Sequence, residues 1–327
     1  MMDWLREIVR ADRRIRNFVR ETPLEHSLPL SGASGSNVYL KLENLQHTGS
    51  FKARGAANKI LSLGEAERAQ GVVAASTGNH GAAVAFAAGA LNARSVIFVP
   101  GHASRAKIEA MKRLGADVRF HGDDCVIAEA YAREYARAEG MAYVSPYNDP
   151  DVVAGQGTVG VEIARVLQRV DRVFVSLGGG GLISGIGLWL KALDPEVHVV
   201  GCSPENSCVM IESLQAGRIL EMDSRPTLSD GTAGGVEPGA ITFELCRDVV
   251  DELVLVSEAE IAGAMRSFIE SHHLLIEGAA GVALAAQAKA GPIPAGGNDV
   301  VVLCGANVSM ETLMALRETP RHGADVE

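Results

Sequence analysis

The sequence predicts an α/β protein built from two open parallel sheets with flanking helices. Short runs rich in Val, Ile and Phe alternate with Ala-rich segments of helical length along most of the chain. These runs are almost continuously apolar, as is typical of parallel strands that are buried on both faces. The 327 residues contain more such runs than one ordinary sheet needs, so we expect two domains.

The alternation predicts the following elements in chain order. Strands are expected at residues 38–42, 72–75, 95–99, 118–120, 142–144, 172–176, 197–201, 252–256 and 300–303. Helices are expected at residues 53–63, 79–91, 103–114, 123–139, 155–168, 182–193, 205–217, 239–249, 257–272, 277–290 and 309–317. The residues Ser257 to Glu260 read Ser-Glu-Ala-Glu, which is a capping box and predicts that a helix begins there. The tail from residue 318 onward is expected to be frayed.

The clearest break in the chain is the turn-rich stretch at residues 145–151, which contains two prolines, an asparagine and two aspartates. We place a domain boundary there. Residues 67–149 have a regular strand–helix rhythm and are predicted to form a small domain. Residues 1–66 and 150–327 would form the large domain. A ligand would lie in the cleft between them, at the carboxyl ends of the strands, with the small domain closing over it.

Composition excludes several classes of protein. Hydrophobic residues make up 47% and charged residues 21%, which is a globular composition. The net charge of −10 argues against a nucleic-acid partner. No long apolar run is present, so neither a secretory signal nor a membrane span is expected. The five cysteines are scattered and odd in number, which favours a reducing cytoplasm over a disulfide framework or a zinc site.

One basic segment, residues 8–20, stands out from the acidic background. Ile8, Ile15, Phe18 and Val19 recur in it at helical spacing, which predicts a surface helix docked on the fold. A mitochondrial presequence is the alternative, but acidic residues such as Asp12 are unusual in such leaders.

The first candidate for chemistry is Lys52. It follows the turn-like residues 48–50 and opens a helical run in which Ser50 is the expected N-cap. Apolar surroundings and the positive end of the helix dipole would lower the pKa of this amine, as a Schiff-base lysine requires. Most helical lysines are nevertheless solvated, so this stretch alone does not decide between the two roles.

Three loops directly follow predicted strands, where α/β proteins bind ligands. Residues 76–81 read Ser-Thr-Gly-Asn-His-Gly and could receive a carboxylate or phosphate, or could simply form a tight turn and a helix cap. The four glycines at residues 178–181 suit a phosphate cradle, with a flexible hinge as the alternative. Cys304 ends the last strand, and alone it would be a small core residue.

Taken together, these motifs resemble the fold-type II pyridoxal-phosphate enzymes of the threonine/serine dehydratase and serine racemase family. The fold of that family is similar to that of the tryptophan synthase β chain. The resemblance covers nearly the whole chain. It rests on the segments at residues 22–24, 41–46, 49–58, 76–81, 154–158, 178–182, 277–281 and 304–308.

The resemblance implies a role for each matched residue. Lys52 would form a Schiff base with pyridoxal phosphate and then act as the base. The other implied cofactor contacts are Phe51 against the ring, Asn79 at the 3′-oxygen, Gly178, Gly179, Gly180, Gly181 and the Leu182 amide at the phosphate, and Cys304 at the pyridine nitrogen. Ser76, Thr77, Gly78 and His80 would surround the substrate carboxylate.

The implied reaction removes water and ammonia from a small β-hydroxy amino acid, such as L-threonine or L-serine, to give a 2-oxo acid. Cys304 is a weak donor, so the ring nitrogen would stay unprotonated, which favours elimination over transamination. Thr77 stands where serine racemases carry a catalytic serine, so racemisation is an alternative. A third possibility is a non-catalytic metabolite-binding protein.

Further expectations concern specialisation and assembly. The acids of the racemase metal site align with Ser203 and Val209, so no divalent metal is expected. Residues 229–239 resemble the version seen in hydroxyectoine-utilisation dehydratases. No regulatory domain follows in this sequence, which favours a catabolic role. The resemblance also implies a cytoplasmic homodimer or homotetramer.

Overall fold

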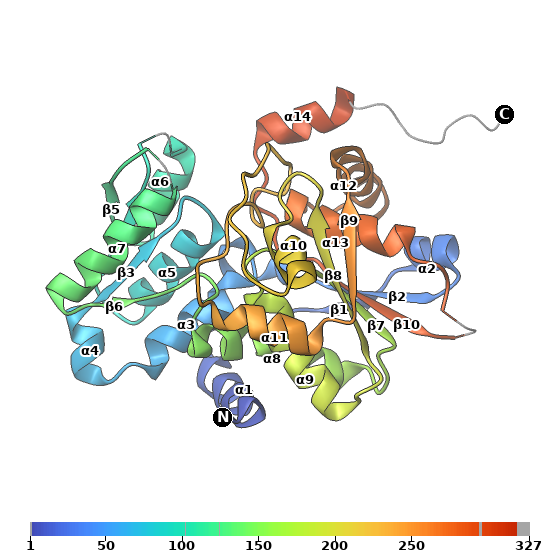
Figure 1. The fold of residues 1–327 in the computed structure, drawn as a ribbon, viewed down its shortest axis with the longest axis horizontal. Coiled ribbons are helices and arrows are strands. Elements are labelled where there is room, and N and C mark those ends of the chain that lie inside the picture. Colours follow the sequence, from blue (N-terminus) through green and yellow to red (C-terminus); the bar gives the residue numbers. More distant parts are fainter. Residues whose placement is uncertain (1, 102, 124, 294–295, 319–327) are drawn as a thin grey trace.

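A computed structural model describes residues 2–101, 103–123, 125–293 and 296–318 of the chain. These residues form two β-sheets with helices around them (Figure 1). The larger sheet has six strands in the order β1-β2-β10-β7-β8-β9. They are β1 (Leu24–His26), β2 (Asn37–Lys41), β10 (Asn298–Val302), β7 (Arg172–Ser176), β8 (His198–Pro204) and β9 (Glu252–Val256).

Five of these six strands run parallel, but β1 pairs antiparallel with β2, with Leu24 opposite Lys41. The predicted parallel sheet is therefore confirmed, and the antiparallel edge strand β1 is an addition that was not predicted. The sequence gives little sign of β1, because the strand has only three residues and two of them, Glu25 and His26, are polar and exposed. An antiparallel edge strand on an otherwise parallel sheet is a common arrangement.

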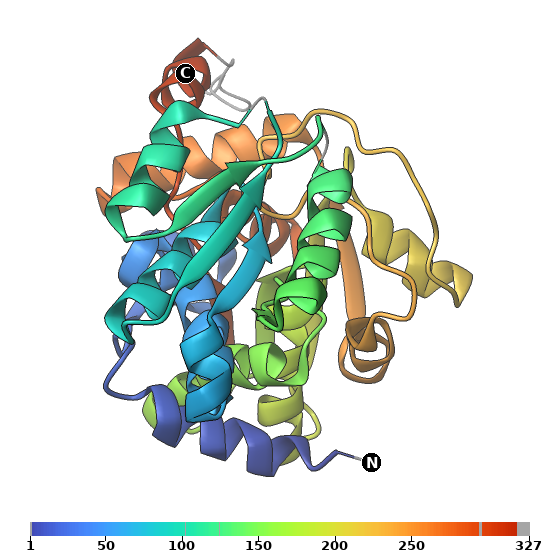
Figure 2. The same ribbon diagram turned by 90° about the vertical axis from the view of Figure 1, so that its left-hand side faces the viewer.

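The smaller sheet has four parallel strands in the order β5-β4-β3-β6. They are β5 (Asp117–Phe120), β4 (Ser95–Val99), β3 (Val72–Ala75) and β6 (Ala142–Tyr143). Figure 2 shows helices on both faces of this sheet. All four strands come from residues 67–149, the region predicted to be a small domain; the exact domain boundaries stay a prediction.

The helices around the smaller sheet are α5 (Asn79–Ala90), α6 (Arg105–Arg113) and α7 (Cys125–Glu139). Helix α3 (Lys52–Ser62) contacts both α5 and α8 (Pro150–Val166), and so lies where the two halves of the molecule meet. Two short elements, α2 (Leu28–Ser34) and α4 (Glu65–Gln70), were not predicted. Their length of about two turns is too short for a periodic apolar pattern to appear.

The larger sheet is covered on both faces. Figure 1 shows α12 (Glu258–His272) and α13 (Gly278–Lys289) on one side, and α8, α9 (Gly181–Leu193) and α11 (Ile241–Val249) on the other. The remaining elements are α10 (Val209–Ala216), α14 (Met310–Glu318) and the 3-10 turns η1 (Glu43–Leu45) and η2 (His47–Gly49). The main core lies between these helices and strands β2, β7, β8 and β10. Of the helices described, none has the length and apolar character needed to span a bilayer.

Several helices begin or end at residues other than those predicted. Helix α8 begins at Pro150, five residues before the expected start, because Asp149 caps it by accepting from the amides of Asp151 and Val152. Part of the turn-rich stretch is thus a helix start with proline at its first position. The capping box at Ser257 and Glu260 is confirmed at the start of α12.

The basic N-terminal segment forms a helix, α1 (Trp4–Ile15), which packs against α8 with Ile8, Ala11 and Ile15 buried. Phe18 and Val19 lie beyond the end of the helix and pack against a second apolar cluster. The predicted docked helix is therefore present, but it begins earlier and ends sooner than expected. The frayed tail lies almost wholly outside the described residues.

Candidate active site

Lys52 is the first residue of α3, and its side chain is directed toward the loop that follows β6. The Nζ amine donates a hydrogen bond to the carbonyl oxygen of Pro146 at 2.8 Å and lies 5.1 Å from the centre of the Phe51 ring. Burial lowers the pKa of Lys52 to about 8, against smaller opposing effects of Cys304 and Glu277. An amine with such a pKa is partly unprotonated near neutral pH and can act as a nucleophile or a base.

The predicted N-cap of α3 was wrong. Phe51 occupies the N-cap position, and the buried hydroxyl of Ser50 has no hydrogen-bond partner among the described residues. Ser50 instead forms a β-bridge with Gly305, and the amide of Phe51 donates to the carbonyl of Cys304 at 3.0 Å. This long-range backbone pairing overrides the local capping preference and ties the Lys52 helix to the loop after β10.

The glycines at residues 178–181 form the wall of the same pocket, between β7 and α9. A Cβ at Gly178 would lie 2.9 Å from the backbone of Thr232, and one at Gly179 would lie 2.4 Å from the ring of Tyr147. Gly180 has a φ of +84° and is the N-cap of α9, which has no side-chain cap. No side chain caps the first amides of α9. These amides carry the partial positive charge of the helix N-terminus, which favours an anion at the glycine wall.

Cys304 follows strand β10 and is almost fully buried. Burial, with the nearby Glu277 carboxyl, raises the pKa of Cys304 well above its usual value, so the thiol is neutral. Its Sγ lies 4.0 Å from Oε1 of Glu277. Ser176, at the end of β7, donates its hydroxyl to the carbonyl of Ala279 at 2.5 Å and lines the pocket beside the thiol.

These residues meet in one pocket. Its lining consists of Phe51, Lys52, Asn79, Tyr147, Ser176, Gly178, Gly179, Gly180, Gly181, Leu182, Gly231, Thr232, Glu277, Ala279 and Cys304. Every residue predicted to contact the cofactor is in this set. The other predicted site residues, Ser76, Thr77, Gly78 and His80, are not, and their roles toward a substrate stay predictions.

His80 lies on the first turn of α5 and is buried. Its Nε2 lies 2.8 Å from the carbonyl oxygen of Val144, which can only accept, so this nitrogen carries the proton. Burial and the charge of Lys52 lower the pKa of His80 to about 3, so the ring is neutral. The histidine thereby ties the loop after β3 to the end of β6.

Glu277 is the main residue of the pocket to which the sequence analysis assigned no role. It occupies the N-cap position of α13, is buried, and receives hydrogen bonds from the Asn79 amide at 2.9 Å and from the backbone amide of Asn307 at 3.1 Å. Burial raises the pKa of Glu277 to about 7, and Asp230 adds to the shift. The only sign of it in the sequence was the family-like segment at residues 277–281.

A buried ion-pair cluster lies behind the Lys52 helix. The Arg54 guanidinium, two residues after Lys52, bonds both oxygens of Glu43 at 2.7 and 2.8 Å and both oxygens of Glu162 at 2.6 and 2.7 Å. The Lys41 amine bonds Glu162 at 2.5 Å. Burial opposes ionisation of Glu43, but the charge and hydrogen bonds of Arg54 outweigh it and hold the pKa of Glu43 below its usual range. The cluster joins β2, η1, α3 and α8.

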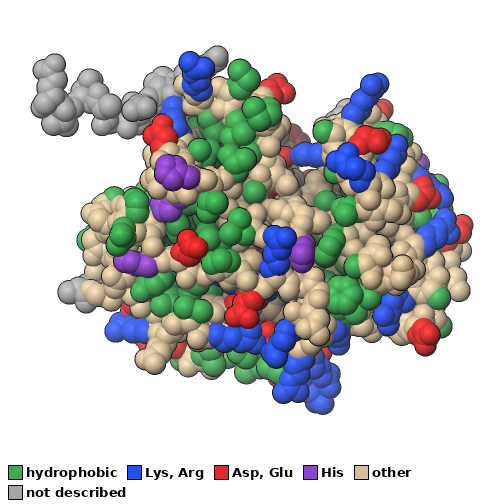
Figure 3. Space-filling model, turned by 180° about the vertical axis from the view of Figure 1, so that it is seen from behind, with side chains coloured by type: hydrophobic (Ala, Val, Ile, Leu, Met, Phe, Trp, Pro, Cys, Tyr) green, Lys and Arg blue, Asp and Glu red, His purple; other side chains and the backbone are tan. Residues whose placement is uncertain are grey.

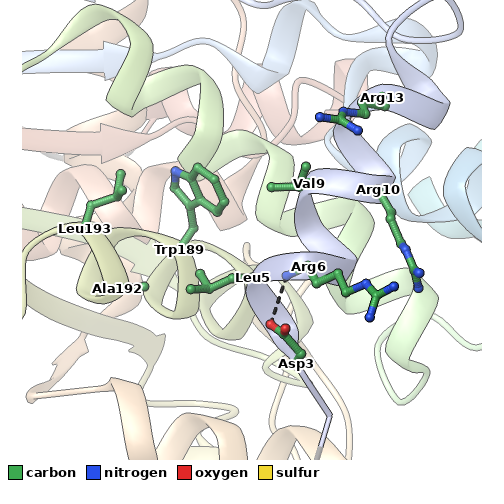
Figure 4. A pocket seen from close by; sticks show the side chains of 9 residues that line it. All are labelled: Asp3, Leu5, Arg6, Val9, Arg10, Arg13, Trp189, Ala192 and Leu193. Carbon is green, nitrogen blue, oxygen red and sulfur yellow. Dashed lines mark hydrogen bonds between the residues drawn. The ribbon is translucent and has the colours of Figure 1, made fainter.

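A second hollow, of about 600 Å³, lies between α1 and α9 (Figure 4). Leu5 and Val9 extend from α1 toward Trp189, while Arg6 and Arg10 extend to the other side of the helix (Figure 4). The hollow is open and shares no lining residue with the Lys52 pocket. It is a packing groove between helices, and we assign it no chemistry.

The two positions that align with the acids of the racemase metal site carry no acidic side chain, one at the end of β8 and one at the start of α10. Ser203 is buried and donates its hydroxyl to the carbonyl of Leu177 at 2.6 Å, and Val209 is buried at the start of α10. Within the described ranges, no three His, Cys, Asp or Glu side chains gather in a way that could hold a metal ion. Among the cysteines whose side chains the structure describes, Cys202, Cys208, Cys246 and Cys304 are free thiols.

Comparison with known proteins gives consistent matches. The model of a family described as pyridoxal-phosphate dependent enzymes matches residues 15–305. An L-threonine ammonia-lyase of Thermotoga maritima is 43% identical over 311 residues, covering 94% of this chain and 77% of the relative. A catabolic L-threonine dehydratase of Staphylococcus aureus is 40% identical, covering 98% of this chain and 93% of the relative.

Solved structures agree with this result. The processed form of threonine deaminase isoform 2 from Solanum lycopersicum superposes with a TM-score of 0.91 at 33% identity, covering 97% of this chain and 92% of that one. Maize serine racemase superposes with a TM-score of 0.89 at 30% identity, covering 95% of each chain.

Proposed function

Because the chain belongs to the family of pyridoxal-phosphate dependent enzymes, we propose that it is an ammonia-lyase that acts on a small β-hydroxy amino acid. The substrate is L-threonine or L-serine, and the net products are a 2-oxo acid and ammonia, because the water that is first eliminated is matched by the water that hydrolyses the enamine. The names of the relatives support this reaction. The observation that carries the proposal is the meeting, in one pocket, of the Lys52 amine, the glycine cradle and a neutral thiol.

Pyridoxal phosphate is the cofactor of this family, and the shape of the pocket supports its placement. The cradle at residues 178–181 has no room for side chains, so backbone amides, including that of Leu182, can approach a phosphate closely. Phe51 offers a flat apolar face for the ring, and Asn79 offers an N–H group for the phenolic oxygen. When bound, the cofactor supplies a sink for the electron pair left on Cα after the α-proton leaves.

Lys52 supplies two functions in turn. Its amine would hold the cofactor through its aldehyde, and Nζ, once free of the cofactor, would take the α-proton of the substrate. A pKa of about 8 suits both tasks, because the amine can be freed of its proton near neutral pH and can hold one afterwards. The proton held on Nζ would then pass to the β-hydroxyl, which leaves as water, and the released enamine hydrolyses to the 2-oxo acid and ammonia.

Cys304 directs the outcome toward elimination. Its thiol is neutral and a weak donor, so at the ring nitrogen of the cofactor it would supply no charged acid. A less electron-withdrawing ring favours prompt loss of the β-hydroxyl over slow side reactions such as transamination.

The loop at residues 76–80 is proposed to hold the substrate. Ser76, Thr77 and the amides around Gly78 would surround the substrate carboxylate at the start of α5, where the helix dipole favours an anion. His80 would keep this loop in place through its bond to Val144. The hydroxyl of Thr77 is the group that could return a proton to the opposite face of Cα.

We also propose that the protein works in the cytoplasm as a homodimer or homotetramer. The free thiols among the described cysteines support a reducing compartment. Figure 3 shows hydrophobic side chains, interspersed with other residues, over the left-hand half of one face, which supports association. Light scattering of the purified protein measures the assembly directly.

A screen for 2-oxo acid release tests the proposed reaction. L-Threonine, L-serine, phenylserine, 3-hydroxyaspartate and amino acids derived from hydroxyectoine are each incubated with the cofactor-loaded protein. We expect 2-oxo acid from threonine or serine, and none from the Lys52→Ala variant. Chiral analysis of the remaining serine checks for racemisation. Turnover of none of these compounds by the loaded wild type would contradict the proposal.

A further inference from the structure

The side-chain amide of Asn79 is held from two sides by residues far away in the sequence. Its Nδ2 donates to both carboxyl oxygens of Glu277 at 2.9 Å. Its Oδ1 accepts from Nδ2 of Asn307 at 2.6 Å. Asn79 begins α5, Glu277 precedes α13, and Asn307 lies in the loop after β10, so three separate elements meet at this one amide.

The hydrogen-bond network determines which way each amide faces. An asparagine oxygen and nitrogen are almost the same size, so their partners decide the orientation. The carbonyl oxygen of Thr48 can only accept, and it lies 2.8 Å from Nδ2 of Asn307. The second N–H of the same Nδ2 then points to Oδ1 of Asn79. The Nδ2 of Asn79 must therefore face Glu277, whose carboxylate accepts.

The backbone conformation of the turn at Thr48 allows its carbonyl oxygen to accept from Asn307. Thr48 has a φ of +60°, a left-handed conformation that is unfavourable for a β-branched residue. Gly49 follows with a φ of +72°, and a Cβ there would lie 2.9 Å from Oδ1 of Asn307. A Cβ at Gly305 would likewise lie 2.5 Å from Glu277. Both glycines leave room for the two side chains that hold Asn79.

We propose that Asn307 and Glu277 are positioning residues that hold the Asn79 amide in one orientation, with an N–H group directed at the cofactor's phenolic oxygen. The Nδ2 of Asn79 has two hydrogens, and the two oxygens of Glu277 share one of them. The other remains for the cofactor. This inference rests on the proposed placement of Asn79 at the phenolic oxygen.

Two substitutions at Asn307 separate this role from simple packing. Asn307→Asp keeps the shape but places acceptors against the acceptors Thr48 O and Asn79 Oδ1, so the Asn79 amide is expected to turn around. Asn307→Ala only removes the bond, and water can replace it at this exposed position. We therefore expect the dissociation constant for pyridoxal phosphate to rise about tenfold in Asn307→Asp and about threefold or less in Asn307→Ala.

The measurement is a titration of apo-protein with pyridoxal phosphate, without substrate, followed by the visible absorption of the bound cofactor. The control is Asn206→Asp, because Asn206 also donates from Nδ2 to a backbone carbonyl, that of Pro226 at 2.7 Å, but lies outside the pocket lining. It should change the affinity less than about twofold. If Asn307→Asp does not fold, Glu277→Gln is measured in its place. A glutamine can turn its N–H donor toward Asn79, so this substitution should also weaken the binding of pyridoxal phosphate.

The outcomes are distinct. A larger loss of affinity for pyridoxal phosphate in Asn307→Ala than in Asn307→Asp would indicate that these residues act by packing, and it would overturn the inference. Unchanged affinity in Glu277→Gln would overturn it as well. Unchanged affinity in Asn79→Ala would overturn both the placement of Asn79 and the clamp. Neither result depends on turnover, so the proposed lyase reaction stands or falls separately in the 2-oxo acid screen.

Discussion

At the scale of single residues, the site depends on three buried groups whose pKa values differ from those in water. Burial lowers the pKa of Lys52 to about 8 and raises that of Glu277 to about 7, and it keeps the Cys304 thiol neutral. Near neutral pH the pocket therefore holds an amine that can lose its proton and a carboxyl that can gain one. Such shifted groups in one pocket are typical of active sites.

Glu277 makes the stability of the apo-protein depend on pH. Its pKa is higher in the folded chain than the ordinary value of 4.5, so the unfolded chain loses this proton first as the pH rises. The free energy of unfolding therefore falls as the pH rises from 4.5 to about 7. Above that pH the ionised Glu277 lowers it by about 3 kcal/mol in all. Asp230 and Lys107 act on the same carboxyl in opposite directions.

We therefore expect Glu277→Gln to reduce the loss of apo-protein stability between pH 5 and pH 8 by about 2–3 kcal/mol relative to the wild type. Urea denaturation at the two pH values measures this difference. Glu205→Gln, a change at an exposed glutamate, is the matched control and should leave the pH dependence unaltered. Equal slopes in wild type and Glu277→Gln would show that the carboxyl does not carry this penalty.

Sequence alone could locate Lys52, Asn79, the four glycines and Cys304, because each lies in a short motif next to a predicted strand or helix. It could not assign roles to Glu277 and Asn307, because their side chains meet Asn79 only through folding, across 198 and 228 residues. It also misassigned the N-cap of α3, since the bridge between Ser50 and Gly305 is a long-range contact that no local pattern reveals.

At the scale of elements, helix α3 carries Lys52 on one end and is anchored by Arg54 two residues further on. The cluster of Lys41, Glu43, Arg54 and Glu162 is buried and contains two positive and two negative side chains. Its charges therefore balance, and every carboxylate oxygen has a donor. Removing one partner would leave buried charge without compensation.

Arg54→Met is expected to destabilise the protein by about 3–5 kcal/mol, because Glu43 and Glu162 would be left buried and unpaired. Chemical denaturation of the apo-protein measures this loss. The matched control is Arg247→Met, which breaks the exposed pair with Glu244 and should cost less than about 1 kcal/mol. A similarly small cost for Arg54→Met would mean that packing, and not the ion pairs, holds α3.

The sequence predicts most of the strands and helices that the structure contains, but it predicts the residues at which they begin and end less well. The continuous apolar strands and Ala-rich helices are long enough to show a period, and all nine predicted strands are present. The additional strand β1 and the helices α2 and α4 are too short for that signal. Helix α8 starts early because its cap, Asp149, lies within a stretch whose prolines and asparagine read as a turn.

At the scale of the whole molecule, two sheets point the carboxyl ends of β3, β7 and β10 toward one pocket. Two ion pairs join the region of the small sheet to the loop at residues 229–239. Arg133 on α7 bonds Glu237 at 2.7 Å, and Lys107 on α6 bonds Asp230 at 3.2 Å. We propose that residues 67–149 form a small domain that closes over the pocket, with the Arg133–Glu237 pair stabilising the closed form.

This proposal predicts that Arg133→Gln raises KM for the substrate about threefold to fivefold with a smaller change in kcat, because closure is weakened while the catalytic groups are untouched. Steady-state kinetics measure the effect. Lys107→Gln is the control, since the Lys107–Asp230 pair is more exposed and longer, and it should change KM less than about twofold. Equal effects of the two substitutions would argue against a specific latch at Arg133.

The claim on which the whole account depends is that Lys52 forms the covalent bond to the cofactor. Borohydride reduction of the cofactor-loaded protein, followed by digestion and mass spectrometry, tests it directly. The account predicts a single cofactor adduct on the peptide that contains Lys52, and no adduct in Lys52→Ala. An adduct on another lysine, or a wild-type protein that remains unmodified after loading and reduction, would contradict it.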